Sequence, residues 1–169
     1  MQLLVIRHAI AEDKEAFAET GRPDDERPLT KRGRKTMAKA TRGLRREVKS
    51  LDVLAASPLV RAKQTAAIVA AEYGDIFIDT VSALEPGATM SSFATWLATR
   101  RRAKVVAIVG HEPHLGALVT WLISGVTTSH IELDKGGACL IEIDGKPRGG
   151  CATLLWSLPS AVLSKLGAG

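Results

Sequence analysis

Arginine and histidine side chains follow three apolar runs of the sequence, each at a point where a buried strand is predicted to end. Arg7 and His8 follow the first run. Arg61 comes shortly after the second run, and His111 follows the third. In a mostly parallel sheet the carboxyl ends of neighbouring strands meet at one edge, where ligands commonly bind. The sequence therefore predicts that these four side chains converge.

The chemistry of such a cluster points to an anion. The four side chains include no acid, so they would repel one another unless a negative charge lay between them. A phosphoryl dianion meets this requirement, because guanidinium groups match its oxygens and helix N-termini attract it. Taken singly, Arg61 is typical of a surface charge and His111 of an ordinary polar residue. The three segments together favour a phosphate-binding site.

The elements that must position this cluster alternate between strand and helix. Short apolar runs predict strands, and the Asp144–Gly145 turn signal predicts antiparallel pairing near the C-terminus. The predicted strands cover residues 3–6, 53–56, 76–78, 105–109, 131–133, 138–143 and 152–156. We therefore expect an α/β fold, a three-layer α/β/α sandwich with a mostly parallel central sheet and an antiparallel C-terminal part. Because no linker or repeat interrupts the pattern, we expect residues 1–169 to form a single domain.

The helices between these strands carry recognisable start signals. Thr30 is a predicted N-cap for residues 31–49, and Ser57 a predicted N-cap for a second helix with Pro58 at its first position. Further helices are expected from Thr89 or Ser91 to Arg101 and over residues 113–123. The 31–49 helix is amphipathic. Its apolar face holds Met37, Ala40, Leu44 and Val48, and its solvated face holds Lys35, Lys39, Arg42, Arg46 and Lys49.

Composition limits the class of protein. The 169 residues include 23 Lys and Arg against 18 Asp and Glu, a net charge of +5 that favours acidic partners without requiring nucleic acid. No apolar run approaches the roughly 20 residues that a membrane-spanning helix needs, and the first residues do not resemble a signal peptide. We therefore expect a cytoplasmic protein that does not bind membranes. Cys139 and Cys151 are not in a CxxC pattern and are expected to be free thiols.

Four segments, in colinear order, resemble motifs of the histidine phosphatase superfamily. Residues 4–9 (LVIRHA) look like its N-terminal signature, and residues 28–33 (PLTKRG) are similar to its LT..G helix entry. Residues 57–66 (SPLVRAKQTA) match its SP..RA.QT segment, and residues 109–111 (VGH) resemble its second histidine segment. The resemblance extends from residue 3 to about residue 125. The short chain, with no room for a helical cap, is similar to the compact SixA-type phosphohistidine phosphatases.

This resemblance implies a mechanism. His8 would be the nucleophile, and water would hydrolyse the resulting phosphohistidine intermediate. Arg7, Arg61 and His111 would hold the phosphoryl oxygens. We expect the arginines to depress the pKa of His8 below its reference value of about 6.5 and the second ring nitrogen to donate to a backbone carbonyl. The superfamily usually has Gly after the nucleophile, and Ala9 stands there instead, so we expect an ordinary φ at that position.

The proton donor is left open by the sequence. Glu85 lies where the family often places an acid, Glu112 is the alternative, and Glu85 could equally be a solvated loop carboxylate. A phosphohistidine substrate needs little proton donation, because imidazole is a good leaving group. We expect no cofactor and no metal site. His111 and His114 have helical spacing, but no ligand cluster surrounds them, and His114 is expected on the helix surface.

Two alternatives remain. A phosphoglycerate-mutase-type enzyme would return the phosphoryl group to a sugar acid, but the missing cap argues against it. A catalytically inactive domain could bind polyanions through the basic helix face and residues 100–104, but His8 and Arg61 favour an enzyme. The expected partner is a phosphorylated protein carrying phosphohistidine, or a small phosphorylated molecule, and not nucleic acid. We expect a monomer or a weak homodimer.

Overall fold

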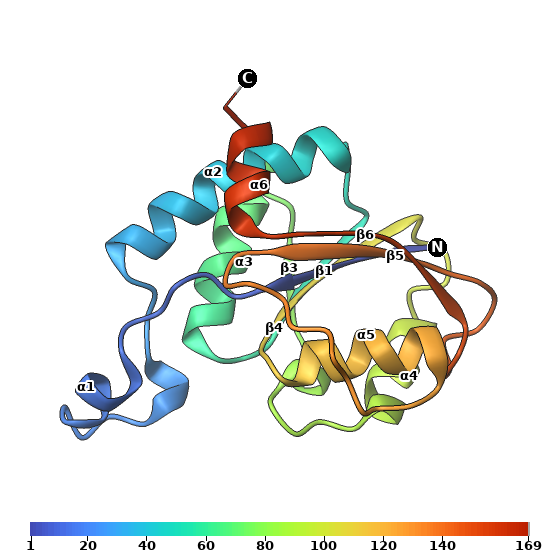
Figure 1. Cartoon of the computed structure of the whole chain (residues 1–169), viewed down its shortest axis with the longest axis horizontal. Helices are drawn as coiled ribbons and strands as arrows, with labels where there is room; N and C mark the ends of the chain where they lie inside the picture. Colours follow the sequence, from blue (N-terminus) through green and yellow to red (C-terminus); the bar gives the residue numbers. More distant parts are fainter. Residues whose placement is uncertain (169) are drawn as a thin grey trace.

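A six-stranded sheet runs through the middle of the molecule (Figure 1). The computed structural model describes residues 1–168. Four neighbouring strands are parallel, the fifth strand pairs antiparallel with the last of these four, and the sixth pairs antiparallel with the fifth. In the spatial order of the sheet the strands are β3 (Ile78–Thr80), β2 (Val53–Ala56), β4 (Val105–Gly110), β1 (Gln2–Arg7), β5 (Ala138–Ile143) and β6 (Ala152–Leu158). This arrangement confirms the predicted fold class.

Helices cover both faces of this sheet (Figure 1). Alternate residues of β1 point to opposite faces, as a strand requires: Leu4 and Ile6 belong to one apolar core, Leu3 and Val5 to the other. The first core packs against α2 (Lys31–Glu47), α3 (Val60–Glu72) and α6 (Ser160–Leu166), the second against α4 (Met90–Ala98) and α5 (His114–Ser124). Within residues 1–168, no helix combines the length and apolarity needed to cross a membrane.

The segment between β1 and α2 contains a short helix, α1 (Lys14–Ala18), and a 3-10 turn, η1 (Asp24–Glu26). It is held at its C-terminal end by the predicted N-cap. The Thr30 hydroxyl accepts from the Gly33 N–H at 2.9 Å, and the Thr30 N–H donates to the Ile10 carbonyl at 3.0 Å. A Cβ on Gly33 would lie 2.0 Å from the Ile10 oxygen. The PLTKRG segment therefore fixes the chain just after His8.

Two predicted strands differ in the structure. Residues 131–133 form no strand, because the Leu133 N–H donates at 2.9 Å to the Glu112 carboxylate instead of to a neighbouring strand. Near residue 76 the strand begins only at Ile78, and Phe77 is 80% exposed. Helix α2 ends at Glu47 and not at the predicted residue 49, so Val48 lies just beyond it, but all four side chains of the predicted apolar face are buried.

Candidate active site

The carboxyl edge of the sheet gathers the chemically active side chains. β1 and β2 both pair with β4 in parallel, so His8, Ser57 and His111 leave the sheet at the same level. The His8 N–H donates to the Gly110 carbonyl, and the Ser57 N–H to the Val109 carbonyl, each at 3.0 Å. The ring centroids of His8 and His111 are 5.1 Å apart. Side chains separated by about a hundred residues thus become neighbours.

The imidazole of His8 is held in one tautomer. Its Nδ1 lies 2.7 Å from the Ala9 carbonyl oxygen, and because a carbonyl only accepts, Nδ1 carries the proton. Nε2 is therefore left with a free lone pair. Burial, opposed by this hydrogen bond and assisted by the Arg61 and Arg7 charges, lowers the pKa of His8 to about 4. The expected neutral nucleophile is present, although burial and not the arginines is the main cause.

Ala9 keeps an ordinary backbone. Among residues 1–168, Asp75 is the one non-glycine residue with a positive φ. The Ala9 N–H donates to the Thr65 hydroxyl at 3.1 Å, and that hydroxyl donates to the Arg61 carbonyl at 2.7 Å. The prediction for Ala9 is therefore confirmed, and its backbone is tied to the helix that carries Arg61.

His111 is bonded to Ser57. Its Nε2 lies 2.9 Å from the Ser57 hydroxyl, and the ring is 2% exposed. Burial, with smaller contributions from His8 and Arg61, lowers the pKa of His111 to about 3. The predicted N-cap position is wrong: α3 begins at Val60 after an N-cap at Leu59, and the Ser57 hydroxyl accepts only a long hydrogen bond, of 3.4 Å, from the Leu59 N–H. The shorter hydrogen bond of this hydroxyl, of 2.9 Å, is to the buried imidazole of His111, which is the costlier group to leave unpaired.

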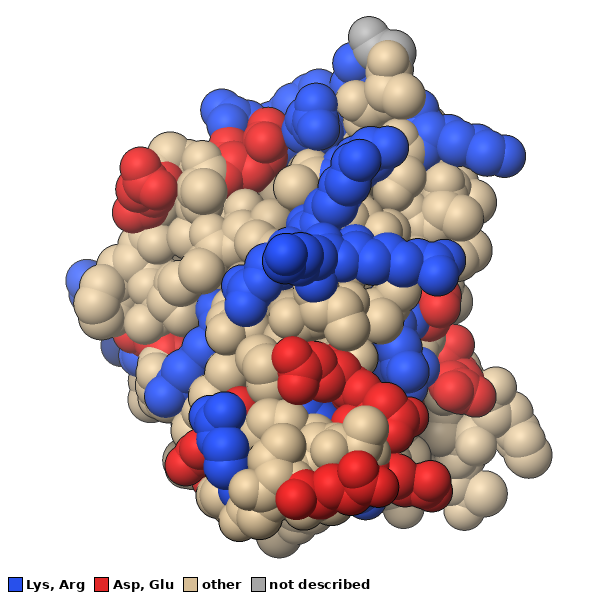
Figure 2. All heavy atoms as spheres, turned by 90° about the vertical axis from the view of Figure 1, so that its left-hand side faces the viewer, with Lys and Arg blue, Asp and Glu red and all other residues tan. Residues whose placement is uncertain are grey.

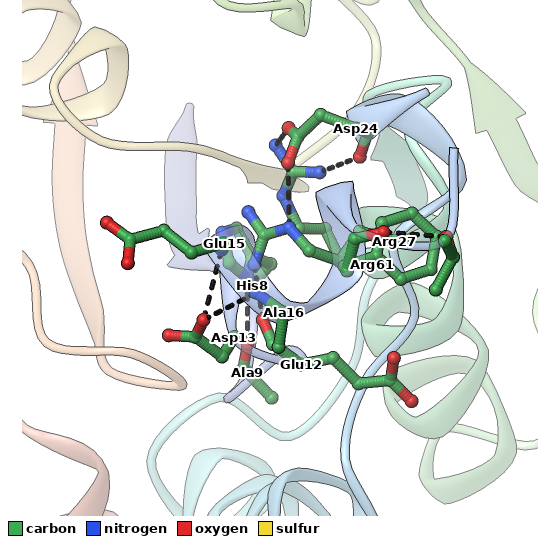
Figure 3. A network of polar contacts seen from close by, with 11 residues as sticks. His8, Ala9, Glu12, Asp13, Glu15, Ala16, Asp24, Arg27 and Arg61 are labelled. Carbon is green, nitrogen blue, oxygen red and sulfur yellow. Dashed lines mark hydrogen bonds and ion pairs between the residues drawn. The ribbon is translucent and has the colours of Figure 1, made fainter. Parts of the chain in front are cut away.

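Arg61 is paired with an acid that the sequence analysis did not place there (Figure 3). Its Nη1 donates to the Asp24 carbonyl at 2.8 Å, and its Nη2 lies 3.1 Å from Asp24 Oδ2. Arg27 Nε donates to Oδ1 of the same carboxylate at 2.7 Å, and Arg27 Nη1 donates to the Glu12 carbonyl at 2.7 Å. Asp24 therefore holds two guanidinium groups beside His8 and offsets their charge. With both imidazoles neutral, the expected repulsion among four cations is absent.

Arg7 is positioned from the other side. Its Nη1 donates to the Leu133 carbonyl at 2.5 Å and lies 3.5 Å from the exposed Glu132 carboxylate. Glu112 holds this segment, since its two carboxylate oxygens accept from the Leu133 and Gly116 N–H groups at 2.9 and 3.1 Å. Glu112 is thus engaged in structure. A groove of about 490 Å³ opens beside Arg7, lined by Arg7, Glu112, Pro113 and residues 129–132.

Three buried nitrogens in this cluster have no hydrogen-bond partner among the described residues. They are Arg7 Nε, Arg61 Nε and His111 Nδ1. Unpaired buried polar groups are costly and uncommon, and at a cationic site they indicate an anion-binding function. The arrangement can bind a small oxyanion and present it to the lone pair of His8 Nε2.

Two other predicted residues lie apart from these contacts. Glu85 follows the 3-10 turn η2 (Ser82–Leu84) and is half-buried, and within the described part of the chain no hydrogen bond or ion pair joins its carboxylate to the cluster. Its role as the acid stays a prediction. His114 is 6% exposed, so its expected place on the helix surface is wrong. No group of three His, Cys, Asp or Glu side chains within residues 1–168 has the arrangement of a metal site.

Comparison with known proteins assigns the family. The model of the histidine phosphatase superfamily (branch 1) matches residues 3–85. A protein of Picosynechococcus is 32% identical over 139 residues, which is 81% of this chain and 82% of that protein.

Two solved structures share the fold. The protein histidine phosphatase SixA complexed with tungstate aligns with a TM-score of 0.79 at 22% identity, covering 96% of this chain and 99% of that one. The alpha-ribazole phosphatase from Shigella flexneri aligns with a TM-score of 0.74 at 21% identity, covering 95% and 97%.

The chain belongs to the histidine phosphatase superfamily. Its compact sheet and helices have the architecture of the SixA structures. Phosphatase activity is accordingly the class of function that the family assigns to it.

Proposed function

We propose that this protein hydrolyses a phosphoryl group through a phosphohistidine intermediate on His8, and that its substrate is a protein phosphohistidine or a small phosphorylated molecule. The observation that carries the proposal is that buried nitrogens of Arg7, Arg61 and His111 have no partner, while His111 lies against the His8 ring and both arginines act on its neutral imidazole. Structural resemblance to a SixA protein complexed with tungstate, a tetrahedral oxyanion, supports the same interpretation.

The first step transfers the phosphoryl group to the enzyme. The Nε2 lone pair of His8 attacks phosphorus, the bond between phosphorus and the leaving group breaks in line, and the leaving group departs with that electron pair. Arg7, Arg61 and His111 bind the three equatorial oxygens, where charge spreads in the transition state. Positioning and electrostatic stabilisation are the main protein contributions to such a reaction. The Ala9 carbonyl stabilises the positive charge that develops on the His8 ring.

The second step returns the enzyme to its free form. Water attacks the phosphorus of the intermediate, inorganic phosphate forms, and the electron pair returns to His8 Nε2. An alkoxide leaving group in the first step needs a proton, for which Glu85 is the candidate, whereas an imidazole leaving group needs little help. A Glu85→Gln change should therefore slow hydrolysis of alkyl phosphates more than that of a phosphohistidine.

Activity measurements test the proposal directly. The wild-type chain should hydrolyse p-nitrophenyl phosphate and a histidine-phosphorylated protein without a bisphosphate primer, and His8→Ala should reduce both activities by more than about 10³-fold while the fold persists. Strict dependence on a primer would support the mutase alternative. Full activity in the His8→Ala variant would contradict the proposed nucleophile.

A further inference from the structure

Helix α2 carries an unbroken row of cations on its exposed face. The row, here called the basic stripe, consists of Lys31, Lys35, Lys39, Arg42 and Arg46. All five side chains are exposed, and successive members are three or four residues apart, which places them side by side on a helix. At about 1.5 Å per residue the stripe is about 22 Å long. That length exceeds what a small phosphorylated molecule could contact.

Within residues 1–168, no side chain of the stripe forms an ion pair. The five ion pairs found among residues 1–168 all lie elsewhere. Each stripe residue therefore has a like-charged neighbour on the helix, an arrangement that destabilises a helix, and Glu72, which lines a groove with Arg42 and Arg46, forms no ion pair with them. The opposite face of α2 is fully used in packing against the sheet and α6. The stripe contributes nothing visible to folding, so its charges are available to a partner.

The stripe shares a face of the molecule with the candidate active site. Figure 2 views the molecule from the side toward which the carboxyl end of β1 runs, and basic side chains gather there over α2 with acidic side chains below them. The first turn of α2 packs directly on the backbone of Ile10, two residues after His8. A macromolecule whose phosphoryl group enters the site can therefore also reach the stripe.

We propose that the basic stripe docks an acidic surface of a protein that carries the phosphohistidine substrate, an inference that rests on the proposed function. Charge complementarity favours an acidic surface. A polynucleotide is disfavoured, because it would extend its uniform charge over the exposed acids of residues 12–26 on the same face. The exposed residues of α2 also include no aromatic side chain on which bases could stack.

Matched charge-reversal variants test this docking surface. The stripe variant is Lys35→Glu/Lys39→Glu/Arg42→Glu. The control is Arg101→Glu/Arg102→Glu/Lys104→Glu, which changes the net charge equally but lies at the opposite edge of the sheet. The probes are two phosphohistidine peptides, flanked by six glutamates or by six glutamines, and p-nitrophenyl phosphate.

The wild-type chain should prefer the glutamate-flanked peptide by about tenfold in kcat/KM, mainly through KM, and raised salt should remove the preference. The stripe variant should lose this preference, while the control keeps it. Both variants should hydrolyse p-nitrophenyl phosphate within about twofold of wild type.

Other outcomes overturn the proposal in distinguishable ways. Equal hydrolysis of both peptides by wild type, or a preference that survives in the stripe variant, contradicts the docking surface alone. A preference lost equally in the control shows a dependence on net charge and not on the stripe. Stronger inhibition by a duplex DNA than by an unphosphorylated glutamate peptide contradicts the choice of a protein partner. Hydrolysis of p-nitrophenyl phosphate but of neither peptide contradicts the phosphohistidine substrate itself.

Discussion

The carboxyl and amino edges of the central sheet both carry basic side chains, which are buried at the carboxyl edge and mostly exposed at the amino edge. At the carboxyl edge, His8, Arg61 and His111 are each less than 9% exposed. At the amino edge, Arg101 and Lys104 are exposed to solvent. Arg100, on the same side, is satisfied by an ion pair of 2.9 Å with Asp79.

The volume of the surface grooves does not distinguish the two edges. A groove of about 500 Å³ at the amino edge, lined by Asp52, Val53 and residues 99–103, matches the groove of about 490 Å³ beside Arg7. Buried nitrogens without a hydrogen-bond partner do distinguish the two edges, since three of them lie in the cluster around His8 at the carboxyl edge. Burial without a partner, and not charge or hollow volume, therefore marks the candidate site.

The largest expected contrast between the edges is in catalysis. Arg61→Ala should lower kcat/KM for p-nitrophenyl phosphate by about 10²–10³-fold, because a buried donor to the transition-state oxygens is lost. Arg101→Ala, at the amino edge, should change it by less than about twofold. Steady-state kinetics of the two variants measure this difference. Similar losses of kcat/KM in both variants would contradict the proposal that only the carboxyl edge is catalytic.

Stability should depend on pH at the carboxyl edge. The unfolded chain protonates its histidines near pH 6.5, whereas the folded pKa values are about 4 for His8 and about 3 for His111. The unfolded state therefore binds more protons as the pH falls from about 6.5 toward 4, and the free energy of unfolding decreases there.

Removing one of these histidines should flatten that dependence. His111→Asn should reduce the slope of the unfolding free energy by about 1.4 kcal/mol per pH unit between pH 4 and 6, as measured by urea denaturation. Arg101→Gln should leave the slope unchanged. A slope unaffected by His111→Asn would mean that this imidazole titrates normally in the folded protein.

A smaller effect is expected from the hydroxyl behind His111. Ser57→Ala leaves Nε2 of His111 without its partner and frees the ring to turn, so kcat should fall by about tenfold and stability by about 1 kcal/mol. KM for p-nitrophenyl phosphate should change little. A loss of stability with an unaltered kcat would restrict Ser57 to a purely structural role.

Local sequence patterns correctly predicted most of the strands and helices that position the site. The apolar run before Arg7 was sufficient to predict β1, and Thr30 was sufficient to predict the start of α2, because each signal depends only on residues close by in the sequence. Asp24 and Arg27 were missed because their role depends on how residues 11–28 fold back over Arg61, which no periodicity encodes.

The errors have the same origin. Ser57 has the sequence context of a helix cap, but a distant imidazole competes for its hydroxyl. Residues 131–133 have the apolarity of a strand, but the Glu112 carboxylate takes the Leu133 N–H. In each case a long-range polar contact overrides a local preference, and such contacts concentrate where the site is assembled.

The central claim is that His8 becomes phosphorylated during turnover. Rapid-quench sampling with labelled phosphohistidine protein or p-nitrophenyl phosphate, followed by peptide mapping, tests it directly. We predict a transient phosphate on His8 that is labile in acid and stable in base, and that is absent from the His8→Ala variant. Turnover without such an intermediate, or phosphate found on another residue, would contradict the account.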